Sequence, residues 1–324
     1  MSSTMKADFS APGPCFDTNV TPTAHGTSYP AIDPTRPELS QAGKTVLIVG
    51  GTSGIGLAIA KGFIAASASA VIIAGRGQEQ LDIARASLEQ EAAAKANRKE
   101  TRIIAERSDA ADLVAIDALW SGLAARGIVV DVLVFNTVKT VTPGPLLTLG
   151  TQHVWEGLEL SVRSLLRFAE KLNGQENASD GTKYLLNVST AAVNTSHKAY
   201  FPMTAERPEY ALAKGAAALA LQFVAQDVDP EQLQVISFHP GTIFTPGVER
   251  LGIPANAFPF DDESLPGSFA VWAASEEARF LHGRWVWASW DVTELAQGEL
   301  RKRLDSEVDF LRISVGGLAG TNLA

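Results

Sequence analysis

Short apolar runs, rich in β-branched residues, recur along the chain between residues 45 and 288, and most are followed by a stretch with helical spacing. Because the runs are apolar throughout and do not alternate, they predict parallel strands that are covered on both faces. The strands expected are 45–49, 70–74, 102–107, 129–135, 183–188, 233–238 and 284–288, and the main helices are 55–66, 78–96, 111–125, 151–172 and 209–228. This alternation predicts an α/β fold, either a doubly wound parallel sheet or an eight-stranded barrel.

The regions outside this alternation have a different composition. Residues 1–43 are rich in Pro, Thr and Ser and predict an extended or disordered N-terminal arm, flexible or lying over the domain or a neighbouring subunit. Residues 44–291, which contain the whole alternation, are expected to form a single domain. Within it, four prolines and two phenylalanines at 246–267 predict a loop that acts as a substrate lid. Residues 292–324 form a C-terminal tail with a short amphipathic helix near 295–308.

A glycine-rich loop, Gly50-Gly-Thr-Ser-Gly-Ile-Gly56, joins the first predicted strand to the first predicted helix. Glycines at this position allow a tight turn and a close approach of the backbone to a pyrophosphate, which the N-terminus of the following helix attracts. An ordinary glycine-rich turn between a strand and a helix has the same composition. Barrels place such loops late in the chain, so this early loop favours a seven-stranded, doubly wound Rossmann-type sheet.

The second predicted strand ends at Ala74-Gly75-Arg76. Folds that select NAD place an acidic side chain here to accept the ribose 2′-hydroxyl, and none is present. Arg76 offers a planar, positive group suited to a 2′-phosphate, which favours NADP(H) over NAD(H). The alternative is that Arg76 is a solvated surface residue.

Tyr210 and Lys214 are four residues apart in a predicted helix, which places them on one face about 5–6 Å apart. Tyrosine has an ordinary pKa of about 10, and lowering it by about 3 units takes roughly 4 kcal/mol. A cation about 4–5 Å away at an effective dielectric near 20 supplies about that amount. We therefore expect Lys214 to lower the pKa of Tyr210 into the range for general acid–base work. Ser189, which ends the fifth strand, is the expected hydrogen-bond donor to the substrate oxygen.

In combination, these motifs resemble the short-chain dehydrogenase/reductase family over roughly residues 44–290. The resemblance implies that Ser189, Tyr210 and Lys214 are catalytic and that Lys214 also holds the nicotinamide ribose. It implies that Asp109 contacts the adenine and that Asn136 supports the edge of the cofactor site. The full set of cofactor-binding residues implied is Gly50, Thr52, Ser53, Gly54, Ile55, Gly56, Arg76, Asp109, Asn136, Tyr210, Lys214, Pro240, Gly241, Ile243 and Thr245.

Three departures from the family pattern concern the site. The usual Asn-Ala-Gly is Asn136-Thr137-Val138, which adds bulk beside the cofactor, and Ser161 stands where many members have asparagine. Ser189 and Tyr210 are 21 residues apart, which is more than the family's usual spacing. The extra residues fall within 191–208, a segment that normally borders the substrate, and indicate a large or hydrophobic substrate. The stretch 281–295 resembles a variant common among fungal members, many of them linked to secondary metabolism.

Composition excludes several other classes. The formal net charge is −9 and the pI about 5.1, which argues against nucleic-acid binding. Cys15 is the only cysteine, so no disulfide can form within the chain, and no His, Cys or acidic cluster has metal-ligand spacing. No apolar run is long enough to span a membrane and no signal peptide is recognisable, which favours a cytoplasmic location.

These observations predict an NADP(H)-dependent oxidoreductase that interconverts a ketone or aldehyde with an alcohol by hydride transfer. A carbonyl reductase for a bulky, hydrophobic, small-molecule substrate is the form we expect. The alternative is an enzyme of the same fold that catalyses a non-redox isomerisation or cyclisation with NADP bound. The family commonly forms homodimers or homotetramers through the helices at 151–172 and 209–228, and we expect one of these states.

Overall fold

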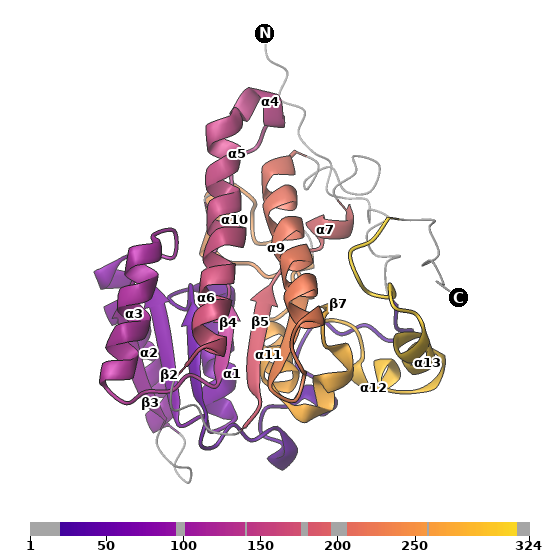
Figure 1. The fold of residues 1–324 in the computed structure, drawn as a ribbon, viewed down its shortest axis with the longest axis horizontal. Coiled ribbons are helices and arrows are strands. Elements are labelled where there is room, and N and C mark those ends of the chain that lie inside the picture. Colours follow the sequence, from indigo (N-terminus) through magenta and orange to yellow (C-terminus); the bar gives the residue numbers. More distant parts are fainter. Residues whose placement is uncertain are drawn as a thin grey trace.

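A parallel sheet of seven strands forms the centre of the protein in the computed structural model, which describes residues 20–94, 101–139, 141–175, 181–195, 206–257 and 259–315 (Figure 1). The strand order is β3-β2-β1-β4-β5-β6-β7, so it reverses between β1 and β4, and their carboxyl ends border the crevice where such sheets bind ligands. This confirms the predicted doubly wound sheet. The strands are β1 (Thr45–Val49), β2 (Ala70–Gly75), β3 (Arg102–Arg107), β4 (Val132–Phe135), β5 (Lys183–Val188), β6 (Leu233–His239) and β7 (Arg284–Trp287).

Two hydrophobic cores lie on opposite faces of the sheet. Alternate residues of β1 supply both: Val46 and Ile48 pack in one core, whereas Leu47 and Val49 pack in the other. All four are at most 3% exposed, which explains why this strand is apolar without alternation. The first core is covered by α1 (Gly54–Ala65), α2 (Gln78–Ala93) and α11 (Ser264–Ala273), and the second by α3 (Leu113–Ala125), α6 (Ser164–Asn173) and α9 (Pro208–Gln226).

The helix predicted at 151–172 is interrupted. Its first part is α5 (Thr151–Leu158), which follows the short α4 (Leu146–Leu149), and its last part is α6. Between them lies one π-helical turn, Glu159–Arg163, which contains the buried Ser161. Such turns insert an extra residue into a helix and occur frequently at functional sites.

The described part of the N-terminal arm packs against the domain. Residues 20–43 include two 3₁₀ turns, Pro30–Ile32 and Pro37–Leu39, and Tyr29, Ile32 and Leu39 are buried in the first core. Arg36 forms an ion pair with Glu277 at 2.8 Å. The arm therefore lies over the domain from residue 20 onward, and Cys15 lies outside the described residues.

The helix α11 overlaps the predicted lid. It begins at Ser264, and the lid residues 264–267 form its first turn. Pro266 is tolerated there because the first backbone N–H groups of a helix have no intrahelical partner. The lid therefore ends before Ser264, earlier than predicted, and it contains one short helix, α10 (Pro246–Arg250).

The C-terminal residues cover the outer edge of the sheet. The 3₁₀ segment Glu276–Leu281 leads into β7, and α12 (Val292–Leu295) and α13 (Gly298–Ser306) follow it. Trp285 N in β7 then donates to Leu311 O at 2.8 Å, so the tail satisfies an edge strand that would otherwise be open. Among the described residues, no helix is long and apolar enough to cross a membrane.

Candidate active site

The glycine loop folds tightly on itself between β1 and α1. Gly50 and Gly54 have φ values of +83° and +52°, in the left-handed region that favours glycine. A Cβ on Gly56 would lie 2.1 Å from Gly50 O and 2.7 Å from Asn136 Nδ2, so only glycine fits. Asn136 Nδ2 donates to Gly50 O at 3.0 Å, which ties the end of β4 to the loop. This cradle at a helix N-terminus fits the pyrophosphate of a dinucleotide.

The remaining loop residues connect the cradle to the next strand. Ser53 is the extended residue before α1, and Ile55 lies in its first turn. Thr52 lies beside Gly75 at the end of β2, since a Cβ on Gly75 would be 2.8 Å from Thr52 Cγ2. The loop therefore contacts the position just before Arg76, where a ribose 2′-substituent is expected.

Two arginines are exposed at this point. Arg76 follows β2, and Arg107 ends β3 next to it, with Arg107 Nε donating to Arg76 O at 3.2 Å. Arg107 escaped the sequence analysis because a weak strand end carried no motif, and only the register Gly75↔Arg107 brings it here. Asp109 lies two residues further on, where its Oδ1 accepts from Ala111 N at 3.0 Å.

Tyr210 lies in the first turn of α9, and its hydrogen-bond partner is a residue that the sequence analysis did not name. A side-chain hydrogen bond joins it to Thr190, the residue after Ser189. Ser189 is 3% exposed, and its Oγ accepts a hydrogen bond from Trp285 Nε1 at 3.0 Å. The side-chain partner of Tyr210 in this structure is therefore Thr190, and Ser189 Oγ is the acceptor for Trp285.

Thr190 is a second candidate, beside Ser189, for the hydroxyl at the substrate oxygen. Its Oγ1 also accepts from Ala192 N at 3.2 Å, which fixes the hydroxyl at the start of α7 (Ala192–Thr195). The sequence-based prediction named Ser189, which closes the fifth strand, and did not consider Thr190. Two adjacent residues point in different directions at a strand end, and the tertiary structure alone shows which one faces Tyr210.

The pKa of Tyr210 differs from the expectation. Desolvation by burial raises the pKa of the phenol, and the hydrogen bond with Thr190 lowers it by less. The expected lowering by Lys214 is therefore absent from this structure. As a result, the phenol is protonated at neutral pH.

Lys214 is buried one turn further along α9, where it is 3% exposed. Its Nζ donates to Val188 O at 2.9 Å and to Thr137 O at 3.2 Å, which links it to the ends of β5 and β4. Burial lowers the pKa of Lys214 to about 8. An ammonium has three donors, so one N–H remains for a ribose hydroxyl.

A further buried carboxyl precedes Tyr210. Glu209 is 3% exposed and fits only because Gly157 on α5 has no side chain: a Cβ there would lie 1.7 Å from Glu209 Oε1. Burial raises the pKa of Glu209, while Lys139 and His153 lower it by less. Sequence analysis missed this residue because a glutamate at a helix N-terminus is usually exposed.

The segment after β6 closes the other side of the site. Pro240 and Gly241 follow the strand, with Gly241 at φ +95°, and Ile243 is 6% exposed. Thr245 lies over the glycine loop, because a Cβ on Gly54 would be 3.1 Å from Thr245 Cγ2. Thr245 Oγ1 also accepts from Val248 N at 3.2 Å and caps α10. The predicted segment and the glycine loop are thus neighbours.

His239 ends β6 close to this segment. It is 8% exposed and lies edge-on to Trp287, with ring centroids 4.8 Å apart. Burial lowers its pKa to about 3, so the ring is neutral at physiological pH.

The enlarged segment 191–208 is described only in part. Its residues His197, Tyr200, Phe201 and Met203 lie outside the described residues, as does Phe258 of the lid. Among the described residues, no group of three or more His, Cys, Asp or Glu could hold a metal ion.

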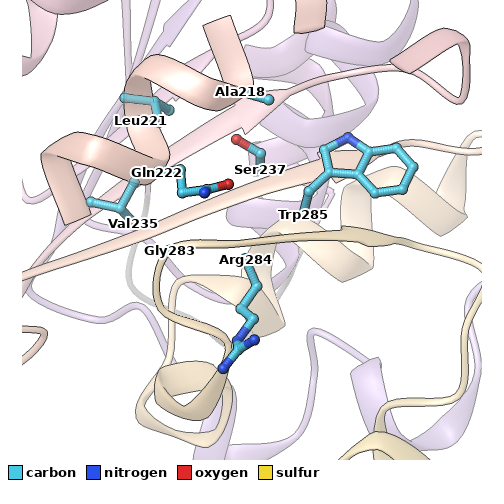
Figure 2. A pocket seen from close by; sticks show the side chains of 8 residues that line it. All are labelled: Ala218, Leu221, Gln222, Val235, Ser237, Gly283, Arg284 and Trp285. Carbon is cyan, nitrogen blue, oxygen red and sulfur yellow. The ribbon is translucent and has the colours of Figure 1, made fainter. Parts of the chain in front are cut away.

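Two cavities lie away from the carboxyl edge. A cleft of about 580 Å³, lined by polar residues that include Lys44, Asp131 and Tyr184, lies where β1, β4 and β5 begin. A cavity of about 10 Å³ between α9 and β7 is lined by Ser237, Gln222 and Arg284, beside Trp285 (Figure 2). It is large enough for about one water molecule. Neither coincides with the residues around Tyr210.

The sheet order, the glycine cradle and the helix with Tyr210 and Lys214 together define the fold of a nicotinamide-binding oxidoreductase. The family model described as short chain dehydrogenase matches residues 44–253. The chain belongs to the short-chain dehydrogenase/reductase family.

Relatives and solved structures agree with this assignment. The chain is 34% identical over 300 residues to a short chain dehydrogenase/reductase of Claviceps purpurea, covering 91% of this chain and 94% of that protein. It is 32% identical over 277 residues to the short chain dehydrogenase/reductase nsrO of Aspergillus novofumigatus, covering 84% and 89%.

Two solved structures share the fold. The L-sorbose reductase of Gluconobacter frateurii, complexed with NADPH and L-sorbose, matches with a TM-score of 0.65 and 22% identity, over 77% of this chain and 96% of that one. The RhlG/NADP complex of Pseudomonas aeruginosa matches with a TM-score of 0.66 and 18% identity, over 78% and 97%.

Proposed function

We propose that the protein is an NADP(H)-dependent carbonyl reductase, which interconverts a ketone or aldehyde with the matching alcohol. The observation that carries this proposal is the hydrogen-bonded Thr190–Tyr210 pair, one helical turn from the buried Lys214. Thr190 follows the carboxyl end of β5, and Lys214 on α9 bonds to the ends of β4 and β5, the edge of the sheet where the glycine cradle lies. A nicotinamide cofactor, when bound there, supplies or accepts the hydride.

The chain's own residues provide the proton transfer. Because burial raises the pKa of Tyr210, its phenol holds a proton at neutral pH and can donate it to a carbonyl oxygen. Thr190 supplies a second hydroxyl that stabilises the developing negative charge on that oxygen. Lys214 binds the ribose with its remaining N–H and contributes positive charge near the phenol.

The π-helical turn supports the route by which Tyr210 regains its proton. Such a turn departs from the regular i→i−4 ladder and occurs frequently at functional sites. Ser161 lies in this turn, where the family resemblance places an asparagine that acts through its carbonyl. A backbone role is independent of the side chain, so serine is compatible with it.

The preference for NADP(H) rests on positive charge at the end of β2. Arg76 and Arg107 are both exposed there, and no carboxylate occupies the position that would accept a ribose 2′-hydroxyl. Two guanidinium groups suit a 2′-phosphate. The two solved neighbours above are complexes with NADP or NADPH, which supports the same choice.

Apolar side chains around the carboxyl edge support a bulky hydrophobic substrate. Val138 after β4, and Phe244 and Leu251 after β6, are 43%, 37% and 36% exposed. Phe244 packs edge-on against Phe260 at the far end of the lid, with centroids 5.2 Å apart. Exposed apolar residues next to a catalytic group indicate a surface that a ligand covers.

Exposed side chains on α5 and α9 support assembly of identical subunits. Trp155 is 56% exposed, and Leu212 and Phe223 are 42% and 56% exposed. We propose that these helices form the interface of a homodimer or homotetramer. Light scattering of the purified chain tests this, and Phe223→Glu should shift the assembly towards monomer.

The proposed reaction is tested by following the absorbance of NADPH with a panel of bulky ketones and aldehydes. Tyr210→Phe should abolish turnover while NADPH still binds. Tyr184→Phe, at the opposite end of the sheet, serves as the matched control and should retain activity. Substrate conversion without NADPH consumption, unaffected by Tyr210→Phe, would instead indicate a non-redox isomerisation or cyclisation.

A further inference from the structure

The chain on either side of residues 246–260, the first part of the predicted lid, is joined at the base of this segment. Thr242 lies before the segment and Asp261 directly after it. Thr242 N donates to Asp261 Oδ2 at 2.7 Å, and Asp261 N donates to Thr242 O at 2.8 Å. Ile243 and Asp261 also form an isolated β-bridge. The Asp261 carboxylate therefore fixes the backbone that leads to Thr245.

The carboxylate occupies a space that glycines on both sides leave open. A Cβ on Gly241 would lie 2.8 Å from Asp261 Oδ2, and a Cβ on Gly26 would lie 3.2 Å from Asp261 Oδ1. Burial raises the pKa of Asp261, and the hydrogen bond from Thr242 N lowers it by less. The principal partner of this charge is thus a backbone N–H.

Residues 24–28 of the N-terminal arm form hydrogen bonds with the residues that follow Asp261. Gly26 O accepts from Asp262 N at 2.7 Å, and Ser28 N donates to Ser264 Oγ at 3.2 Å. His25 pairs with Asp291 at 2.8 Å, and Ala24 bridges to Trp290. The arm therefore ties the end of the lid to the segment after β7.

We propose that Asp261 is a positioning residue for the nicotinamide end of the cofactor site, a role that rests on the proposed cofactor binding. Only two residues separate Thr242, which Asp261 holds, from Thr245, which lies over Gly54 of the glycine loop. Loss of the carboxylate removes one of the two hydrogen bonds that hold this segment and loosens it, whereas the glycine loop and Arg76, on the adenosine side, keep their own contacts. The effect is therefore confined to ligands that contain nicotinamide.

The test compares Asp261→Ala with Asp261→Asn by isothermal titration of the full chain with NADPH, NADH and 2′,5′-ADP, which lacks nicotinamide. Thr242 is exposed, so the loss of this hydrogen bond has an ordinary cost of about 0.5–1.5 kcal/mol, and Asp261→Ala should weaken NADPH and NADH by the same factor, up to about tenfold. Binding of 2′,5′-ADP should stay within about threefold of wild type. Asp261→Asn keeps an acceptor oxygen and should restore most of the affinity.

Asp262→Ala is the matched control. Asp262 is exposed, and its carboxylate caps Ser264 N at 2.8 Å, so its loss should lower the melting temperature without changing NADPH affinity. Gly26→Val should reproduce the selective loss, because its side chain displaces Asp261. Equal weakening of 2′,5′-ADP and NADPH by Asp261→Ala, or unchanged NADPH affinity, would overturn the proposal.

The same titrations separate this inference from the proposed reaction. A wild-type protein that binds NADPH but reduces no carbonyl would refute the reductase and leave the Asp261 comparison decisive. A wild-type protein that binds neither NADPH nor NADH would overturn both.

Discussion

Ser189 and Trp285 are joined by a hydrogen bond of 3.0 Å from the indole Nε1 to the serine Oγ, across β5, β6 and β7. This contact turns the serine hydroxyl towards the buried tryptophans, while the next residue, Thr190, bonds with Tyr210. The two adjacent hydroxyls therefore have different partners, and substitutions of Thr190 and Ser189 should have different effects.

Thr190→Val should lower kcat by about 100-fold, the usual loss when one donor to a developing oxyanion is removed. Thr190→Ser should keep most of the activity. Ser189→Ala should retain kcat but lower the free energy of unfolding by about 1–3 kcal/mol, because Trp285 Nε1 loses its partner. Steady-state kinetics and urea denaturation measure the two effects, and the opposite assignment of effects would restore Ser189 as the catalytic hydroxyl.

Lys214 should make stability depend on pH. Its pKa is about 8 in the folded, cofactor-free protein and 10.5 in the unfolded chain, so the unfolded state binds more protons between these values. The free energy of unfolding should therefore rise with pH from about 8 to 10.5, by on the order of 3 kcal/mol.

Comparison with Lys214→Met isolates this effect, because Lys44 also has a lowered pKa and titrates in both proteins. The difference in unfolding free energy between wild type and Lys214→Met should change across this range and be constant below pH 8. A difference independent of pH would contradict the buried, desolvated ammonium. Lys214→Met should also weaken NADPH binding.

Arg76 and Arg107 should select the cofactor together. Arg76→Ala should raise the KM for NADPH by at least about tenfold and leave the KM for NADH nearly unchanged, since a charge-assisted hydrogen bond contributes about 1.5–3 kcal/mol. Arg107→Ala should likewise raise the KM for NADPH and leave the KM for NADH nearly unchanged. Arg102→Ala, at the other end of β3, is the control. Equal effects on NADPH and NADH would rule out a 2′-phosphate site.

Gly56 should tolerate no side chain. Gly56→Ala places a methyl group 2.1 Å from Gly50 O and should destabilise the protein by about 1–3 kcal/mol and abolish NADPH binding. Gly122→Ala in α3, where a Cβ meets nothing within 4 Å, should instead stabilise it by about 0.5–1 kcal/mol. Chemical denaturation of the two variants gives the comparison, and similar results for both would contradict the tight loop.

The features that could be predicted from the sequence are those that depend on a residue and its near neighbours in the chain. Strands buried on both faces must be apolar, so β1 and β5 could be read from composition alone. The glycine loop is recognisable because the backbone conformation itself requires glycine at Gly50 and Gly56. The helical spacing of Tyr210 and Lys214 placed both on the same helix, α9.

The sequence by itself therefore determined the doubly wound sheet, the family and the helix that carries both Tyr210 and Lys214. Only the tertiary structure decided which hydroxyl faces Tyr210, what Lys214 bonds to, and how Asp261 and Gly26 meet at the base of the lid. The physical reason is that periodicity records which face of an element is buried. Hydrogen bonds and desolvation depend instead on contacts between residues from distant parts of the chain, and the local sequence does not specify these contacts.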